Sequence, residues 1–361
     1  MCNYNVKDFN NEKLLSGRNR LVIGVDLGGT NTNFGIACLK DDNVKMLYSL
    51  NFKTQDLNSL IPAFLQTIDF VKEKKLGIIE RYCIGAAGVV SDDFKHVDLT
   101  NISWDVNIDE LNDKIDLNNG FIINDFQAIG YGINHLNSDY AGDILKIKEG
   151  IINKEKFLTK SVIGAGTGLG KSILIYDENK EMFIPLSSEG GHSDIPVNDD
   201  FELELINYIK KLRNINENVC YEELLSGRGI EAIYNFLTEQ SNAEETKFTE
   251  EIRDSKNKSI LISKNRKNDK TCSETFRIFI RFYARCAKNF VLETMSQGGL
   301  YLAGGIAMKN HDLFYSEEFI NEFNNAYKRH DVLKKTPIYL IMNYDVSLFG
   351  TCIAAKNYQN R

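Results

Sequence analysis

The sequence predicts an α/β protein made of two duplicated domains with a cleft between them. Its 361 residues are more than one hydrophobic core usually organises. Residues 21–38 and 161–176 share one pattern, in which a short apolar strand is followed by a turn with glycine and threonine and then by a returning strand. Since these two segments stand about half a chain apart, they indicate an internal repeat.

The composition is typical of a globular protein. Hydrophobic residues make up 43% of the chain and charged residues 26%. The 43 basic and 50 acidic side chains leave a net charge of -7, and Lys and Arg are scattered, so we expect no nucleic-acid partner. No apolar stretch approaches the roughly 20 residues that cross a bilayer. The seven cysteines form no CxxC pair, and residues 1–20 lack a signal-peptide core. We therefore expect no membrane partner and a cytoplasmic location.

The first half of the chain alternates predicted strands with a predicted helix. Apolar runs that end in polar or small residues predict strands at 21–25, 33–38, 82–85 and 121–123. Apolar residues at spacings of three and four predict a core-facing helix over 57–71. Residues 1–20 read as a polar tail. We expect a small domain made of residues 21–134 and 344–361.

The second half repeats this order and adds more helices. Strands are predicted at 161–164, 171–176, 301–302 and 338–342, and helices at 201–212, 229–239, 274–297 and 347–357. A polar, charge-rich segment at 241–268 reads as a surface insertion. We expect residues 135–343 to form the large domain.

Three glycine turns follow predicted strands and suit the binding of a polyphosphate. The first begins with the carboxylate of Asp26 and continues as Gly28, Gly29, Thr30 and Asn31, so that backbone N–H groups, a hydroxyl and an amide stand together. A second turn contains Gly166, Thr167 and Gly168, and a third contains Gly304 and Gly305. Each alone is also what an ordinary turn looks like, but three in one chain favour phosphate binding.

Longer motifs resemble those of the bacterial-type glucokinases, within the sugar kinase, actin and Hsp70 superfamily. The segments Asp26–Asn31, Gly164–Gly170 and Ala303–Ile306 are similar to the two phosphate loops and the adenosine loop of that superfamily. Motifs similar to those of the glucokinases lie at Thr100–Trp104, Ile123–Phe126, Gly164–Gly170, Glu189–His192 and Glu222–Gly227. The resemblance covers about residues 21 to 357. It implies two ribonuclease-H-like domains and a glucokinase that uses ATP and Mg²⁺.

The resemblance also implies a role for each matching residue. Asp125 would be the catalytic base, taking the proton of the glucose 6-hydroxyl while the γ-phosphate of ATP is transferred. The substrate-binding set would be Asn101, Asn124, Asp125, Glu189, His192 and Glu222. The three glycine turns would hold ATP, and Asp26 would place Mg²⁺ through its water shell. The partners would be glucose and ATP, and we expect a homodimer.

Several alternatives remain open on the residues alone. Asp125 precedes a predicted helix and would also suit an N-cap. His192 would also suit a structural role or a zinc ligand, although the next cysteine, Cys220, is far along the chain. Glu222 would also suit a helix start or the surface. Two other functions also remain open, namely a kinase for another hexose, such as N-acetylglucosamine or mannose, and a non-catalytic sugar sensor on the same fold.

Two places depart from the glucokinase pattern. Thr32 and Asn33 stand where these enzymes more often carry a small residue and Arg, and Ser187–Ser188 stand where Pro-Gly is usual. These departures put sugar selectivity in question.

Overall fold

The structure is a computed structural model that describes residues 2–15, 17, 19–40, 43–99, 102–136, 143–151, 157–240 and 246–357. Contacts within the chain divide it into two compact units. Unit 1 is Met1–Tyr140, Asp177–Ser187 and Asn343–Arg361, and unit 2 is Ala141–Tyr176 and Ser188–Met342. Each unit is described by itself.

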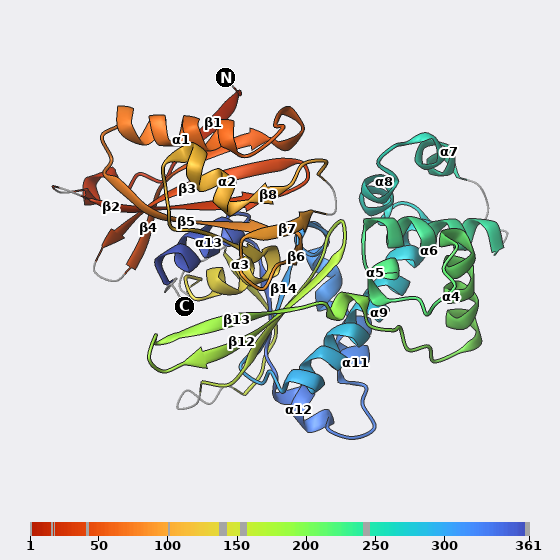
Figure 1. Cartoon of the computed structure of the whole chain (residues 1–361). Coiled ribbons are helices and arrows are strands. Elements are labelled where there is room, and N and C mark those ends of the chain that lie inside the picture. The colour runs from red at the N-terminus through yellow and green to blue at the C-terminus, as the bar shows by residue number, and fades with distance from the viewer. Residues whose placement is uncertain are drawn as a thin grey trace. The chain divides into compact units, whose positions relative to one another are not determined.

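The centre of unit 1 is a six-stranded sheet (Figure 1). Its strands in spatial order are β1 (Tyr4–Asp8), β4 (Asn43–Lys53), β3 (Asn31–Lys40), β2 (Arg20–Leu27), β5 (Ile78–Ala86) and β9 (Gly120–Asn124). The strands β2, β5 and β9 run parallel, and the others pair antiparallel. A small second sheet holds β6 (Gly88–Val90), β7 (His96–Leu99) and β8 (Val106–Asn107). The carboxyl ends of the three parallel strands therefore meet at one edge.

Helices cover both faces of this sheet (Figure 1). One core forms where α1 (Ile61–Glu73) and α2 (Ile108–Ile115) pack on one face, and Phe64 and Val71 of α1 are buried in it as the spacing of apolar residues predicts. On the other face α3 (Asp125–Ile133) and α13 (Val346–Asn357) pack against residues such as Val22 and Cys83. Alternate residues of each strand thus serve different cores.

Glycines let α13 lie close to both the sheet and α3. A Cβ on Gly24 of β2 would lie 2.3 Å from Thr351 Oγ1, and a Cβ on Gly350 would lie 1.7 Å from the carbonyl oxygen of Ala128. Gly132 of α3 is equally close to Val346. Any larger residue would push the elements apart, so these glycines set how closely α13 packs against β2 and α3.

Unit 2 is built around a sheet with the same central order. Its spatial order is β10 (Ile144–Lys148), β15 (Ile338–Ile341), β14 (Gly299–Ala303), β11 (Lys160–Ala165), β12 (Leu169–Asp177) and β13 (Met182–Ser188). All but the last residue of β13 group with unit 1 by their contacts. In both sheets three consecutive strands lie side by side. A later strand pairs in parallel with the first of the three (β5 with β2, β14 with β11), and a still later one pairs in parallel with that strand (β9 with β5, β15 with β14). This shared order confirms the predicted α/β class and its internal repeat.

The helices of unit 2 pack into one large core. They are α4 (Asp200–Arg213), α5 (Tyr221–Leu224), α6 (Gly227–Gln240), α7 (Lys247–Asp254), α8 (Lys258–Asn265), α9 (Lys270–Thr294), α10 (Gly305–Lys309), α11 (Glu317–Asn324) and α12 (His330–Lys335). The longest, α9, begins after Asp269, whose carboxylate caps it by accepting from Cys272 N at 2.8 Å. In the described ranges no helix is both long enough and apolar enough to cross a membrane.

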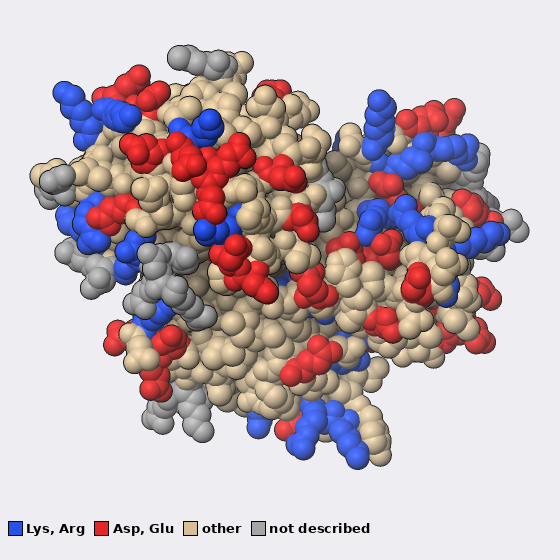
Figure 2. Space-filling view, in the orientation of Figure 1, with Lys and Arg blue, Asp and Glu red and all other residues tan. Residues whose placement is uncertain are grey.

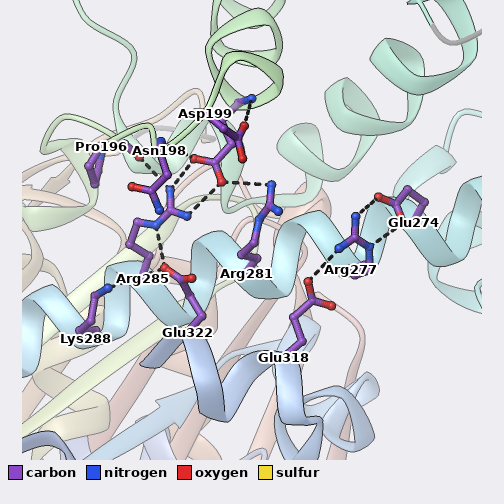
Figure 3. A network of polar contacts seen from close by, with 11 residues as sticks. Pro196, Asn198, Asp199, Glu274, Arg277, Arg281, Arg285, Lys288, Glu318 and Glu322 are labelled. Atoms are coloured by element: carbon purple, nitrogen blue, oxygen red, sulfur yellow. Dashed lines mark hydrogen bonds and ion pairs between the residues drawn. The ribbon is translucent and has the colours of Figure 1, made fainter. Parts of the chain in front are cut away.

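A network of buried charges joins α4, α9 and α11 (Figure 3). Arg285 of α9 donates to both carboxylate oxygens of Glu202, at 2.7 and 3.0 Å, and to Glu322 Oε1 at 2.9 Å. Arg281 Nη2 lies 3.0 Å from Glu202 Oε1. The side chains of Arg285 and Glu202 are 3% and 1% exposed. Elsewhere, Figure 2 shows acidic and basic side chains interspersed over the visible face.

Three segments differ from the sequence-based expectations. Residues 1–20 contain the edge strand β1, which pairs with β4, and the 3₁₀ helix η1 (Glu12–Leu14). The ring centres of Tyr4 and Phe52 lie 5.2 Å apart with the rings tilted. An edge strand is largely exposed, which is why its polar sequence looked like a tail. The described part of 241–268 is helical, in α7 and α8. Residues 177–187 group with unit 1, where Asn134 and Phe183 exchange two hydrogen bonds of 2.8 Å.

Candidate active site

The first glycine turn joins β2 to β3 in unit 1. Its ends are closed by a hydrogen bond from Gly28 N to the carbonyl oxygen of Asn31 at 3.0 Å. Thr54 braces the turn, because its hydroxyl donates to the Gly28 carbonyl at 2.6 Å and its N–H donates to Thr30 O at 3.0 Å. Gly29, Thr30 and Asn31 are exposed. The turn is therefore fixed from behind while its tip faces outward, as an anion-binding loop requires.

Asp26 stands at the carboxyl end of β2, directly before this turn. Its carboxylate accepts from Ser347 Oγ at 2.9 Å and from Asn33 Nδ2 at 3.5 Å. Burial raises the pKa of Asp26, the two hydrogen bonds lower it, and the negative charge of Asp345 raises it further. Asn33, one of the departures from the glucokinase pattern, thus supplies a neutral donor where an Arg would supply a charge. The carboxylate of Asp26 therefore has two neutral hydrogen-bond donors and a second carboxylate, that of Asp345, near it.

Asn124, and not Asp125, caps helix α3. Asn124 Oδ1 accepts from Phe126 N at 2.9 Å, and Gln127 Oε1 accepts from Asn124 N at 3.2 Å, which together form a capping box. Asp125 is the first residue of the helix, where its Oδ1 also accepts from Phe126 N at 2.9 Å. Asn124 is thus the N-cap residue of α3, and the Asp125 carboxylate shares the Phe126 N–H with it.

Asp26 and Asp125 lie at the same edge of the sheet of unit 1. In the parallel ladder Asp26 is level with Gly85, and Ala86 is level with Asn124. Two strand spacings put the ends of β2 and β9 about 10 Å apart. Asn101 lies outside the described residues. The nearby Trp104 packs against the core, and its Nε1 donates to Leu57 O at 3.0 Å.

The second and third glycine turns lie together in unit 2. Their strands, β11 and β14, are parallel neighbours with Gly164 level with Ala303. The second turn is closed by a hydrogen bond of 2.8 Å from Gly166 N to Gly168 O. Gly304 has φ +89°, and a Cβ there would lie 2.6 Å from the carbonyl oxygen of Ala165. Only glycine fits this contact, which brings the adenosine-loop candidate against the second phosphate-loop candidate.

Glu222, predicted as a sugar ligand, lies against the second turn. Its Oε2 accepts from Leu169 N at 2.9 Å, and its Oε1 accepts from Arg228 Nη2 at 2.8 Å. A Cβ on Gly168 would lie 2.4 Å from Glu222 Oε2. The surface reading of Glu222 therefore does not hold, since its side chain is 18% exposed and fully engaged on one side.

Glu189 is the N-cap residue of the 3₁₀ helix η3 (Gly190–His192) in the same unit, and His192 is its last residue. The His192 ring has Nε2 at 3.8 Å from Glu189 Oε2 and Nδ1 at 3.9 Å from Cys220 Sγ. Folding thus brings Cys220 next to His192 across 28 residues, which spacing in the sequence did not reveal. Burial raises the pKa of the Cys220 thiol, and this disfavours the thiolate that a metal ion requires.

Lys171 is a residue near the site that the sequence analysis did not single out. It is 3% exposed, and its ammonium lies 5.0 Å from the ring centre of Phe290 and 5.4 Å from that of Tyr221. A Cβ on Gly190 would lie 3.3 Å from Lys171 Nζ, so this side chain runs along the back of η3. The only feature of the sequence that could have identified Lys171 as a residue near the site is its place directly after the second glycine turn.

Two sheets of the same strand order, with three glycine turns at strand ends, are typical of the phosphate-transferring sugar kinases. Comparison with known proteins leads to the same class. Residues 23–358 match the glucokinase family model. The chain belongs to the glucokinase family. A glucokinase of Nostoc punctiforme is 31% identical over 93% of this chain and 98% of its own, and one of Synechocystis is 26% identical over 91% and 96%.

Solved structures share the fold. A glucokinase from an Antarctic psychrotroph superposes with a TM-score of 0.75 at 23% identity, covering 94% of this chain and 99% of its own. A glucokinase from Balamuthia mandrillaris, solved in complex with glucose, gives a TM-score of 0.75 at 24% identity, with 94% of each chain covered. A ROK-family glucokinase from Streptomyces griseus, in complex with glucose and AMPPNP, gives 0.62 at 19% identity, with 94% of this chain and 100% of its own covered.

Proposed function

We propose that this protein is a glucokinase that transfers the γ-phosphate of ATP to the 6-hydroxyl of glucose, giving glucose 6-phosphate and ADP at the entry to glycolysis. The observation that carries the proposal is the position of Asp125. Asp125 follows a buried strand and shares a sheet edge with Asp26, and the N-cap residue of α3 is the preceding Asn124. Binding sites of open α/β sheets form at the carboxyl ends of the strands, which is where Asp125 lies.

In this proposal each side chain has a distinct task. Asp125 accepts the proton of the 6-hydroxyl as that oxygen attacks the γ-phosphorus and the bond to the β-phosphate oxygen breaks. The other hydroxyls of the sugar are held by amide, carboxylate and imidazole groups, which accept hydrogen bonds from them and fix their orientation. These groups belong to Asn101, Asn124, Glu189, His192 and Glu222. Backbone N–H groups of the glycine turns stabilise negative charge on the phosphoryl oxygens.

The residues present fit a magnesium ion bound mainly by water and phosphate. Asp26 offers a carboxylate that burial and Asp345 leave short of positive charge, and no group of three or more acidic, His or Cys side chains that could hold a metal occurs among the described residues. Mg²⁺ typically takes one or two carboxylates and keeps several waters. Asp26 would hold the ion through water, and the bound ion would neutralise charge on the β- and γ-phosphates.

The location and assembly also belong to the proposal. All seven cysteines are free thiols, as expected in the reducing cytoplasm. Phe201, Leu203 and Leu212 of α4 are large apolar side chains that are 38% to 47% exposed. Exposed apolar residues of this kind favour a subunit interface, so we propose a homodimer, which light scattering on the eluting protein would test.

A panel of hexoses with ATP and Mg²⁺, followed by release of ADP, tests the function. We expect turnover to depend on sugar and to be fastest with glucose. Faster turnover of N-acetylglucosamine or mannose would reassign the substrate while keeping the kinase. If no sugar stimulates release of ADP, the protein is a sugar sensor and the proposal is wrong.

A further inference from the structure

The second glycine turn is held at both of its ends by the segment 222–228. Gly227 N donates to the carbonyl oxygen of Gly166 at 2.9 Å, at the start of the turn. Leu169 N donates to Glu222 Oε2 at 2.9 Å, at its end. The first of these bonds comes from the backbone, but the second depends on where one carboxylate points. Glu222 is therefore the adjustable end of the clamp.

Arg228 fixes the other oxygen of this carboxylate. Its Nη2 donates to Glu222 Oε1 at 2.8 Å and to Glu223 Oε1 at 2.7 Å. The second arginine of the cluster is Arg213. Its Nε lies 3.7 Å from Glu223 Oε2 and its Nη2 donates to the carbonyl oxygen of Arg228 at 3.3 Å, but within the described part of the chain it makes no hydrogen bond to Glu222. The side chain of Arg228 is 45% exposed, whereas that of Glu222 is 18% exposed. An exposed arginine thus orients a largely buried carboxylate.

The peptide of Leu169 connects this carboxylate to the Glu189–His192 segment. Its N–H is bonded to Glu222, and its carbonyl oxygen lies only 2.0 Å from where a Cβ on Gly191 would be. Close packing of this kind transmits small displacements. A shift of Glu222 would therefore move both the second glycine turn and η3.

We propose that Arg228 is a positioning residue that acts through Glu222 and sets the second glycine turn and the Glu189–His192 segment in register. The proposal rests on the proposed function, because it assigns ATP to the turn and sugar to η3. Arg228 touches neither substrate. It holds Glu222 so that the Leu169 N–H bond and a sugar hydroxyl can be served by one carboxylate, which has about four acceptor positions.

The test compares Arg228→Gln with Arg213→Gln, which removes the other arginine of the cluster without a direct loss at Glu222. We expect Arg228→Gln to lower kcat/KM for both ATP and glucose by roughly 10- to 100-fold, since small misplacements of a site have effects of that size. The melting temperature should fall only modestly, because the side chain of Arg228 is 45% exposed and its removal lets water reach the carboxylate oxygens that it leaves. Arg228→Lys should restore part of the activity, and Arg213→Gln should behave like wild type.

Three results would overturn the inference. Equal kinetics in Arg228→Gln and Arg213→Gln would show that Arg228 has no positioning role. A change in kcat/KM for one substrate alone would show that Glu222 does not connect the two segments. A large fall in melting temperature that Arg228→Lys does not reverse would make the role structural. Failure of the proposed function is distinguishable from all three, because wild type itself would then show no sugar-dependent turnover.

Discussion

Position 125 shows how one hydrogen bond separates two explanations of the same residue. Aspartate at a strand-to-helix junction suits both a helix cap and a catalytic base, and the sequence alone left both open. In the structure the cap is the preceding residue, Asn124, with Gln127 completing the box. The helix therefore keeps its cap when Asp125 is changed, which makes the base hypothesis testable without a loss of stability.

Asp125→Asn should lower kcat by at least about 10²–10⁴, the usual contribution of a positioned base. The affinity for glucose should fall less, because the amide still hydrogen-bonds a hydroxyl. The melting temperature should change little, since Asn124 still caps α3. Asn124→Asp is the matched control for stability, because aspartate caps as well as asparagine. Activity within a few-fold of wild type in Asp125→Asn would eliminate this residue as the base.

The variant Asp26→Asn should be more stable than wild type at pH 7 but less active. Burial raises the folded-state pKa of Asp26 above the unfolded value, which is about 3.9. Its charge therefore costs stability above the folded pKa, and this cost disappears as the pH falls below the unfolded pKa. The variant should be more stable than wild type at pH 7, and this gap should narrow on acidification.

Urea unfolding of both proteins from pH 7 down to pH 3.5 measures that gap. The same variant should lose most of its ATP turnover, because the carboxylate that would hold Mg²⁺ is gone. A gap that widens on acidification would contradict the sign of the pKa shift. Full activity at ordinary magnesium concentration would contradict the role of Asp26.

At the scale of elements, the sequence predicts what lies in the core better than what lies at an edge. The apolar runs at 21–25 and 161–164 became the central strands β2 and β11 because both of their faces are buried. The edge strand β1 and the strands β6 to β8 were missed because they are half exposed and carry polar residues. The strand β4 was missed as well, although its residues 46–50 are buried. Alternation is weak in strands of two to five residues.

The predicted site residues fared in a similar way. The sequence alone identifies the glycine turns, Asp26 and Asp125, because particular residue types are favoured in turns and at the ends of strands. The contact between Glu222 and Leu169 N, and the position of Cys220 beside His192, depend on segments that meet only in the fold. No local pattern encodes such contacts.

The buried network on α9 gives a prediction about an element. Glu202→Gln should lower the free energy of unfolding by about 3 kcal/mol, because it leaves the 3% exposed guanidinium of Arg285 short of negative charge. Glu274→Gln removes an exposed partner of Arg277 on the same helix and should cost less than about 1 kcal/mol. Chemical denaturation of the two variants measures both values. Similar losses would mean that burial of the Glu202 pair has no special weight.

At the scale of the whole molecule, the proposed chemistry is divided between the two units. Unit 1 carries Asp26, Asp125 and the first glycine turn, while unit 2 carries the second and third turns with Glu189, His192 and Glu222. Each half is anchored within its own sheet. On this proposal neither unit alone contains both the base and all three glycine turns, so phosphoryl transfer would need groups from both units.

Glucose should therefore draw the two units together. Binding that uses side chains from both would exclude water from the phosphoryl group and make the molecule more compact, as closing enzymes do. Small-angle scattering with and without saturating glucose measures the radius of gyration, which should fall. Mannitol, which has hydroxyls but no ring, serves as the control and should leave it unchanged. Because Asp125→Asn is expected to retain glucose affinity, this variant should still compact while turning over slowly. An unchanged radius in wild type at saturating glucose would contradict the closing movement.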